Sequence, residues 1–225
     1  GNWIVFNGEI YNFADLRKKL EACGHIFQSH TDTEVILKSY AEWGTDCLAR
    51  LRGMFAFALW DRQKKSLFCA VDRFGIKPFY YSQNHGSFAF SSEIKALLNA
   101  GIAPRTLEPL AVESFLAYGA VQAPITMIQG VYALLPAHML IYESATHNLQ
   151  IQQYWTPEVR NASVSMPTKE VLLDSVRHHL IADVPVALFL SGGIDSSALA
   201  ILANEAVGSM ALDSFSFTFT EKEYA

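Results

Sequence analysis

Residues 54–60 read Met-Phe-Ala-Phe-Ala-Leu-Trp, a run without a charged or turn-forming residue. If this run is a strand, Phe55, Phe57 and Leu59 lie on one face and the two alanines lie on the other. A strand with one face in water alternates apolar and polar residues, so this strand is expected to be covered on both sides. We therefore predict a layered α+β domain in which sheet packs on sheet and helices lie outside.

The sequence on either side of this strand predicts the rest of the same domain. Asn12 can cap a helix that stops near Gly24, and Thr31 with Glu34 has capping-box spacing ahead of a second helix. Residues 3–6 are all apolar and are interpreted as a buried strand. Further strands are expected at 66–71, 79–82, 87–91, 138–142 and 149–154, and a further helix at 109–118.

Residues 156–167 are polar and lack periodicity, which predicts a linker between a domain at 1–155 and a second at 168–225. The second region is expected to contain a helix at 169–180, a buried strand at 184–190, a helix at 195–207 and a strand at 214–219. The inward face of its first helix should carry Val171, Leu172, Val176 and Leu180. Together these elements predict one β-α-β unit, the opening of a doubly wound, Rossmann-like α/β sheet.

The junction between that buried strand and the next helix carries the sharpest motif, Leu190-Ser191-Gly192-Gly193-Ile194-Asp195-Ser196-Ser197. Two glycines let the backbone turn its N–H groups toward an anion, and a helix start adds unsatisfied donors. The serines add hydroxyl donors, and Asp195 can hold a Mg²⁺ ion that bridges phosphate oxygens. The plain alternative is a Gly-Gly turn capped by serine. Because strand, glycines, aspartate and helix coincide here, we expect a phosphate site.

This motif has no lysine, which excludes the P-loop of kinases and GTPases. It resembles the pyrophosphate loop, S-G-G-x-D-S, of the N-type ATP pyrophosphatases. Those enzymes cleave ATP between the α- and β-phosphates and activate a carboxylate or carbonyl as its adenylate. The resemblance implies that ATP is bound by Leu190, Ser191, Gly192, Gly193, Asp195 and Ser196.

A second motif, Asn7-Gly8-Glu9, ends the first predicted strand, and Asp32 begins the second predicted helix. Taken alone, Asn-Gly is typical of a hairpin turn and Asp32 of a helix start. The same residues also suit chemistry, since an Asn amide beside a Gly backbone N–H forms an oxyanion hole for amide hydrolysis. Glu9 and Asp32 are two acids suited to the α-ammonium group of an amino acid. The residues by themselves leave both interpretations open.

Composition limits the classes of function. A net charge of −5 without a cluster of Lys and Arg argues against a nucleic-acid partner. No apolar run has the length of a membrane span, so no membrane partner is expected. Cys23, Cys47 and Cys69 are few and are not spaced as metal ligands, which favours reduced thiols in a cytoplasmic protein.

With both motifs in view, the chain resembles the glutamine-hydrolysing asparagine synthetases. The matching segments are N-G-E-I-Y-N (7–12), T-D-T-E-V (31–35), R-G-M-F-A-F-A-L-W-D (52–61), D-R-F-G-I-K-P-F-Y-Y (72–81), S-S-E-I-K-A-L (91–97) and D-V-P-V-A-L-F-L-S-G-G-I-D-S-S (183–197). The resemblance implies an αββα sandwich of the N-terminal-nucleophile amidotransferase type. It also implies a synthetase domain that uses glutamine, ATP and Mg²⁺ to adenylate aspartate and transfer ammonia to it, and it allows a homodimer.

The resemblance also implies roles for single residues. Asn7 and Gly8 form the oxyanion hole and, with Glu9 and Asp32, bind glutamine, while Phe217 on the last strand faces the adenine of ATP. The family's nucleophile is an N-terminal cysteine, whereas this sequence begins at Gly1 and its three cysteines are interpreted as structural. We therefore interpret the sequence as a fragment and expect no glutaminase activity from these residues alone.

Two alternatives stay open at this point. Relatives of the family amidate other carboxylates, such as sugar acids or peptide precursors, or close lactam rings, and the residues quoted above do not select the acceptor. A chain without the nucleophilic cysteine would also suit a binding or regulatory module that has lost catalysis. The first codons of the complete reading frame distinguish that second alternative from an enzyme.

Overall fold

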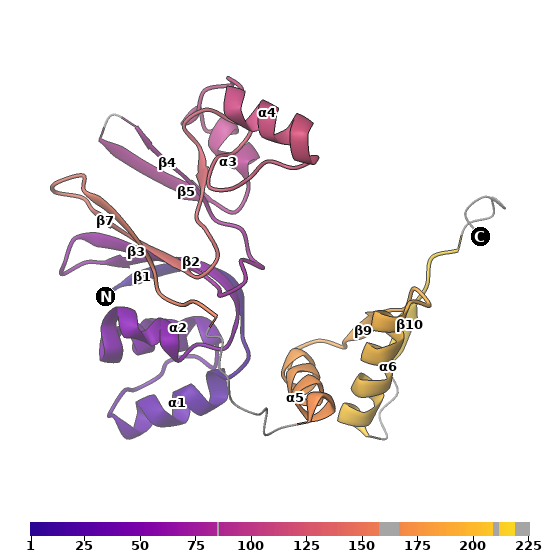
Figure 1. Ribbon diagram of the computed structural model, residues 1–225. Coiled ribbons are helices and arrows are strands. Elements are labelled where there is room, and N and C mark those ends of the chain that lie inside the picture. The colour runs from indigo at the N-terminus through magenta and orange to yellow at the C-terminus, as the bar shows by residue number, and fades with distance from the viewer. Residues whose placement is uncertain (85, 158–166, 209–211, 219–225) are drawn as a thin grey trace. The chain divides into compact units, whose positions relative to one another are not determined.

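A computed structural model describes residues 1–84, 86–157, 167–208 and 212–218 (Figure 1). The chain forms two compact units, residues 1–158 and 159–225. Of the predicted linker at 156–167, residues 158–166 lie outside the described residues. Within the described ranges, no helix has the length and apolar character needed to cross a membrane.

The first unit is built on a five-stranded antiparallel sheet with the spatial order β1-β2-β3-β7-β8. Its strands are β1 (Trp3–Ile10), β2 (Gly53–Asp61), β3 (Ser66–Val71), β7 (His138–Glu143) and β8 (Leu149–Gln153). A smaller antiparallel sheet has the order β5-β4-β6, with β4 (Tyr80–Asn84), β5 (Ser87–Ser91) and β6 (Tyr132–Ala133). In the described part of the chain, β1 is an edge strand.

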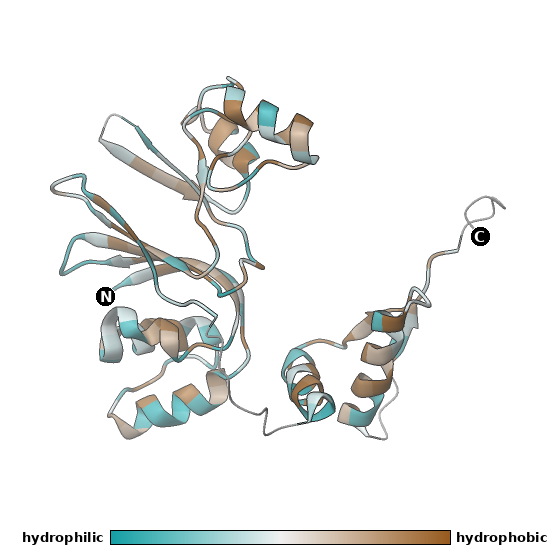
Figure 2. Ribbon diagram, in the orientation of Figure 1, coloured by the Kyte–Doolittle hydropathy of each residue, from teal (hydrophilic) through white to brown (hydrophobic). Residues whose placement is uncertain are grey.

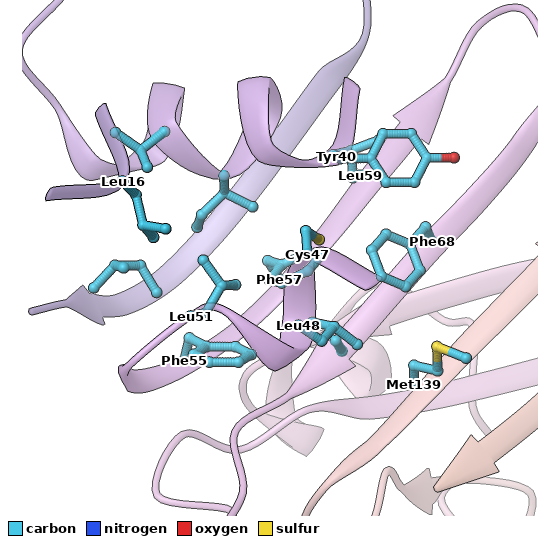
Figure 3. Packing of buried hydrophobic residues seen from close by; sticks show 14 of the residues in the cluster. Leu16, Tyr40, Cys47, Leu48, Leu51, Phe55, Phe57, Leu59, Phe68 and Met139 are labelled. Carbon is cyan, nitrogen blue, oxygen red and sulfur yellow. The ribbon is translucent and has the colours of Figure 1, made fainter. Parts of the chain in front are cut away.

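One side of the large sheet packs against helices. These are α1 (Phe13–Ala22), α2 (Asp32–Trp43) and the short 3₁₀ helix η1 (Gly44–Ala49). Phe55, Phe57 and Leu59 of β2 are buried in this layer (Figure 3). Burial of each such side chain contributes roughly 1.5–3 kcal/mol, so the layer is a main source of the unit's stability.

The opposite side of the large sheet packs on the small sheet. Ala56 and Ala58 of β2 are buried there in one cluster with Phe79 and Tyr81. The small alanine side chains let the sheets approach, and aromatic rings fill the space between them. Phe79 stacks on Phe90 of β5 with ring centroids 5.3 Å apart.

Helices also cover the outer side of the small sheet (Figure 1). Leu97 of α3 (Ile94–Asn99) is buried against Tyr80 and Ala89, and α4 (Pro109–Tyr118) lies next to α3. The layers therefore run helix, sheet, sheet, helix. This order confirms the αββα sandwich, and it gives β2 the two covered faces that its sequence predicts.

Two local predictions in this unit are wrong. Asn12 precedes α1 but does not cap it, because its side chain donates to the Arg50 carbonyl and accepts the Arg52 N–H, both at 2.9 Å. Residues 3–6 do form a strand, but Trp3 and Val5 are 74% and 59% exposed. Their exposure follows from the edge position of β1, where a side chain has neighbours on one side only.

The second unit is a β-α-β unit preceded by a helix, as predicted. Its elements are α5 (Thr168–His179), β9 (Ala187–Phe189), α6 (Ile194–Val207) and β10 (Asp213–Phe215). β9 and β10 pair in parallel. The core consists of Leu173 and Val176 of α5 packed with Leu202 and Ala203 of α6, a helix that is apolar along much of its length (Figure 2).

Several details of this unit differ from the prediction. Val171 and Leu172 are 48% and 47% exposed, and Leu173 takes the inward place beside Val176. The predicted strand at 184–190 is reduced to three residues and is not buried, with Phe189 at 74% exposure. In the described residues β9 pairs with β10 alone, which leaves one edge of β9 and part of its surface without cover.

Candidate functional site

The open edge of β1 presents backbone donors. Phe55 of β2 lies opposite Gly8 and turns away from β1: its N–H donates to Asp72 Oδ2 at 3.1 Å and its carbonyl accepts the Asp72 N–H at 2.8 Å. Gly8 therefore occupies a non-hydrogen-bonded position of the β1–β2 pair, and its own N–H points to the open edge. By the same alternation, the N–H of Ile10 lies on that edge.

Asp32, the first residue of α2, lies at this edge. Its Oδ2 accepts the Ile10 N–H at 3.0 Å. Thr31 sets the start of the helix, because its hydroxyl accepts the Glu34 N–H at 3.3 Å. Gly8 and Ile10 are two residues apart, so their N–H groups lie about 7 Å apart along the strand. The structure thus brings Gly8 and Asp32, two predicted site residues, to one edge.

The Asn7-Gly8 pair is not a hairpin turn, because β1 continues through it to Ile10. Gly8 has φ +150°, and a Cβ at this position would lie 2.1 Å from the Met54 carbonyl oxygen and 2.7 Å from the Phe55 Cα. Such contacts admit only glycine. The strand approach therefore explains Gly8, and the turn interpretation is wrong.

Asn7 and Glu9 project from the face of β1 that carries Ala56 on the neighbouring strand. Asn7 is exposed and lines a pocket of about 280 Å³, together with Phe79, Ser91 and other residues of both sheets. Glu9 is half-buried. Burial and then the charge of Glu9 raise the pKa of Tyr11. Glu9 thus lies on a face of β1, while Asp32 lies at its edge.

The predicted phosphate loop connects β9 to α6. Gly192 has φ +77°, a conformation that favours glycine, and Gly193 is the residue that precedes the helix. The loop is closed by Ser196, whose hydroxyl lies 3.1 Å from that of Ser191 and donates to the Gly193 carbonyl at 3.1 Å. Asp195 is exposed in the first turn of α6. The motif therefore has the strand–loop–helix setting that a phosphate site needs.

Phe217 does not lie on a strand, because β10 ends at Phe215. Phe217 is 81% exposed and stacks on Phe189 with centroids 5.8 Å apart and an interplanar angle of 18°. Ser216 donates its hydroxyl to the Leu190 carbonyl at 2.6 Å, which fixes this segment beside the start of the loop. The aromatic pair is thus exposed near the motif, and its contact with adenine stays a prediction.

Asp195 is the candidate ligand for Mg²⁺. Among the residues that the structure describes, no group of three or more His, Cys, Asp or Glu could hold a metal ion. A Mg²⁺ ion bound to nucleotide phosphates needs only one or two protein carboxylates, since phosphates and waters complete its shell. The residues present therefore fit an ion that arrives with ATP.

Residues 1–155, more than half of the chain, match the family described as glutamine amidotransferase domain. The chain belongs to this family. Residues 168–225 match the family described as asparagine synthase. The amidotransferase domain thus contains the β1 edge with Asp32, and the asparagine synthase match contains the predicted phosphate loop.

Two asparagine synthetases are similar in sequence to this chain over nearly its whole length. Asparagine synthetase [glutamine-hydrolyzing] 3 of Bacillus subtilis is 39% identical over 229 residues, which cover 98% of this chain and 37% of that protein. Asparagine synthetase [glutamine-hydrolyzing] 1 of the same organism is 34% identical over 99% of this chain and 35% of that protein. The chain therefore spans little more than a third of the length of these relatives. A glutamine phosphoribosylpyrophosphate amidotransferase from B. subtilis aligns with a TM-score of 0.48 at 17% identity, over 100% of this chain and 48% of that one.

The amidotransferase domain also contains a residue that the sequence did not single out. Asp72 is 1% exposed and accepts four backbone N–H groups, from Phe55, Phe74, Ile76 and Lys77. An aspartate directly after a buried strand and ahead of a Gly-containing turn is the available sequence signal. It does not reveal that Asp72 reaches back to β2.

Two of the three cysteines of the amidotransferase domain have the surroundings of structural residues. Cys47 and Cys69 are buried. Burial raises the pKa of both thiols, that of Cys47 to about 12. A protonated thiol is a poor nucleophile. Cys23 is exposed and follows the last residue of α1.

Proposed function

We propose that this chain serves glutamine-dependent asparagine synthesis, a reaction in which glutamine supplies ammonia and ATP activates aspartate. The observation that carries the proposal is the presence, in one chain, of the β1 edge with Asp32 and of the loop at 190–197 between a strand and a helix. The β1 edge with Asp32 suits an amino-acid amide, and the loop at 190–197 suits the phosphates of ATP. The names of the relatives support the same pairing of activities.

The spacing along the β1 edge fits glutamine. Asp32 can accept the α-ammonium group, and the Gly8 N–H, which lies about 7 Å along the strand from the Ile10 N–H that Asp32 accepts, can donate to the oxygen of the side-chain amide. The α-nitrogen and Cδ of an extended glutamine are about 5 Å apart, so the two ends of the molecule can lie near two different groups of this edge. Asn7 would add the second oxyanion donor and Glu9 a further negative charge.

The loop at 190–197 would bind the phosphates of ATP. Its exposed backbone, with Gly192, Gly193 and the hydroxyls of Ser191 and Ser196, supplies donors, while Asp195 would hold the Mg²⁺ carried by the nucleotide. The β-carboxylate of aspartate would attack the α-phosphorus and displace pyrophosphate. Ammonia would then attack the acyl carbon and displace AMP, which gives asparagine. The cytoplasmic location and the homodimer stay predictions.

The two half-reactions can be tested separately in the complete gene product. Asn7→Ala removes one oxyanion donor and should lower glutamine-dependent synthesis by about 100-fold while ammonia-dependent synthesis persists. Asp195→Ala should abolish synthesis from both nitrogen sources, because it disables activation of the acceptor. Asn148→Ala, on the β7–β8 turn, and Asp183→Ala, ahead of β9, are matched exposed controls and should change neither activity. Equal loss of both activities in Asn7→Ala would show that Asn7 serves the fold and not catalysis.

A further inference from the structure

Asp72 continues the β2–β3 ladder with its side chain. The ladder of paired strands ends where Ala56 faces Val71. At the next step the Asp72 N–H still donates to the Phe55 carbonyl at 2.8 Å, but the Phe55 N–H donates to the Asp72 carboxylate at 3.1 Å. The Asp72 carbonyl is turned elsewhere and accepts the N–H groups of Gly75 and Ala137. The carboxylate therefore replaces the backbone acceptor that Phe55 would otherwise lack.

The same carboxylate is fixed by the loop that follows. Oδ1 accepts the N–H groups of Phe74 and Ile76 at 3.0 and 3.1 Å, and Oδ2 accepts that of Lys77 at 3.1 Å. Asp72 is 1% exposed, so water cannot take over these bonds. A buried carboxylate with four donors has one available orientation. The direction in which Phe55 turns its N–H is thereby fixed as well.

Phe55 lies opposite Gly8 in the antiparallel β1–β2 pair. In such a pair, the direction of the backbone N–H and carbonyl groups of one residue determines the direction of those groups in the residue opposite. We propose that Asp72 is a positioning residue that keeps the Gly8 N–H pointing to the open edge of β1, where it serves as an oxyanion donor; this inference rests on the proposed function. A Phe55 N–H without its acceptor would be a buried unsatisfied donor, which costs about 1–3 kcal/mol. That cost is enough to shift β2, and Gly8 has no spare room against Met54.

The test compares two buried aspartates in the complete gene product: Asp72, which is bonded to Phe55 near the start of β2, and Asp61, the last residue of β2. Asp72→Asn keeps the side-chain shape but presents an NH₂ group to two of the four donors. We expect kcat for glutamine hydrolysis to fall about 10- to 100-fold, because small displacements of an oxyanion donor are costly. The KM for glutamine should stay within about threefold, since Asp32 is untouched. Ammonia-dependent synthesis should be unchanged.

Asp61→Asn is the matched control. Asp61 is 6% exposed and accepts the N–H groups of Gln63 and Lys64, but it lies at the end of β2 remote from Gly8. The Asp61→Asn variant should be less stable than the wild type and should keep the wild-type kcat for glutamine hydrolysis. If Asp72→Asn also keeps the wild-type kcat, the positioning role is refuted while the proposed function stands. A wild-type protein that does not hydrolyse glutamine would overturn the proposed function and this inference with it.

Amide hydrogen exchange of the wild-type protein tests the geometry that the inference requires, even if Asp72→Asn does not fold. The N–H of Phe55 should be protected, and the N–H of Gly8 should exchange at least about 100-fold faster, because it faces the open edge. This readout does not depend on enzymatic activity. A Gly8 N–H as protected as that of Phe55 in the unliganded protein would overturn the inference.

Discussion

Gly8 shows how a single residue serves both the fold and the candidate site. The strands β1 and β2 approach so closely that no Cβ fits at Gly8, and the same pairing leaves its N–H at the open edge. The sequence motif predicts the residue but not the reason. Asn-Gly is equally typical of a turn, and only the pairing with β2 separates the two interpretations.

Gly8→Ala should therefore destabilise the amidotransferase domain by about 1–3 kcal/mol, through overlap with Met54 and Phe55. Gly24→Ala is the control, because Gly24 also has a positive φ, +93°, but its Cβ would meet nothing within 4 Å. Comparison of the thermal unfolding of both variants separates the cost of the Cβ overlap, which only Gly8→Ala has, from the cost of a positive φ, which both variants have. If Gly8→Ala unfolds at the same temperature as Gly24→Ala, the close approach of the strands does not explain the glycine.

The roles of the three cysteines can also be tested one residue at a time. Cys23→Ala, Cys47→Ala and Cys69→Ala should each retain glutamine hydrolysis in the complete gene product, because an activated thiol needs a lowered pKa and burial raises that of Cys47 and Cys69. Glutamate release is the measurement. Loss of turnover in one folded variant would identify a nucleophile among residues that we interpret as structural.

At the scale of elements, the turn between β2 and β3 is organised by Asp61. Its carboxylate accepts the N–H groups of Gln63 and Lys64 and the hydroxyl of Tyr40 from α2. Burial by itself would raise the pKa of Asp61, but the bonds from Lys64, Tyr40 and Gln63 together lower it below its ordinary value. Asp61 thus connects the sheet to its helical layer.

A carboxyl whose pKa is lowered by folding stabilises the protein above its unfolded pKa, near 3.8, and loses that contribution as the pH falls through the folded value. Asp61→Asn should therefore cost about 2 kcal/mol at pH 7, and the difference from wild type should shrink below pH 4. The difference is measured as the free energy of unfolding of the wild type and of Asp61→Asn between pH 7 and pH 3. A difference that stays constant over this range would show that the charge of Asp61 does not contribute.

A hydrophobic pattern in the sequence predicts an element well where only one structural arrangement is compatible with it. Both faces of residues 54–60 are apolar, which requires cover on two sides and so predicts the sandwich. In α5, three consecutive apolar residues, Val171 to Leu173, fit more than one helical phase, and the prediction took the wrong one. Asp72 was missed because its bond to Phe55 spans 17 positions of sequence, and no local pattern records it.

At the scale of the whole molecule, one chain holds a glutamine amidotransferase domain and a region that matches asparagine synthase and contains the predicted phosphate loop. The strand–loop–helix setting of residues 190–197 could be predicted from sequence, since its glycines and helix start are local signals. The exposure of β9 could not be predicted from the sequence, because the burial of a strand depends on which other elements pack against it. The asparagine synthase match and the loop geometry together support activation of a carboxylate by ATP.

We propose that ATP activates aspartate as an adenylate. The direct measurement supplies the complete gene product with ATP, glutamine and aspartate labelled with ¹⁸O in its β-carboxylate, and analyses the nucleotide by mass spectrometry. Adenylation forms a bond between a carboxylate oxygen and the α-phosphorus, so attack by ammonia must leave that oxygen on AMP. We predict AMP with one ¹⁸O atom for each asparagine formed. Release of ADP, or of AMP without label, would rule out activation of aspartate as an adenylate.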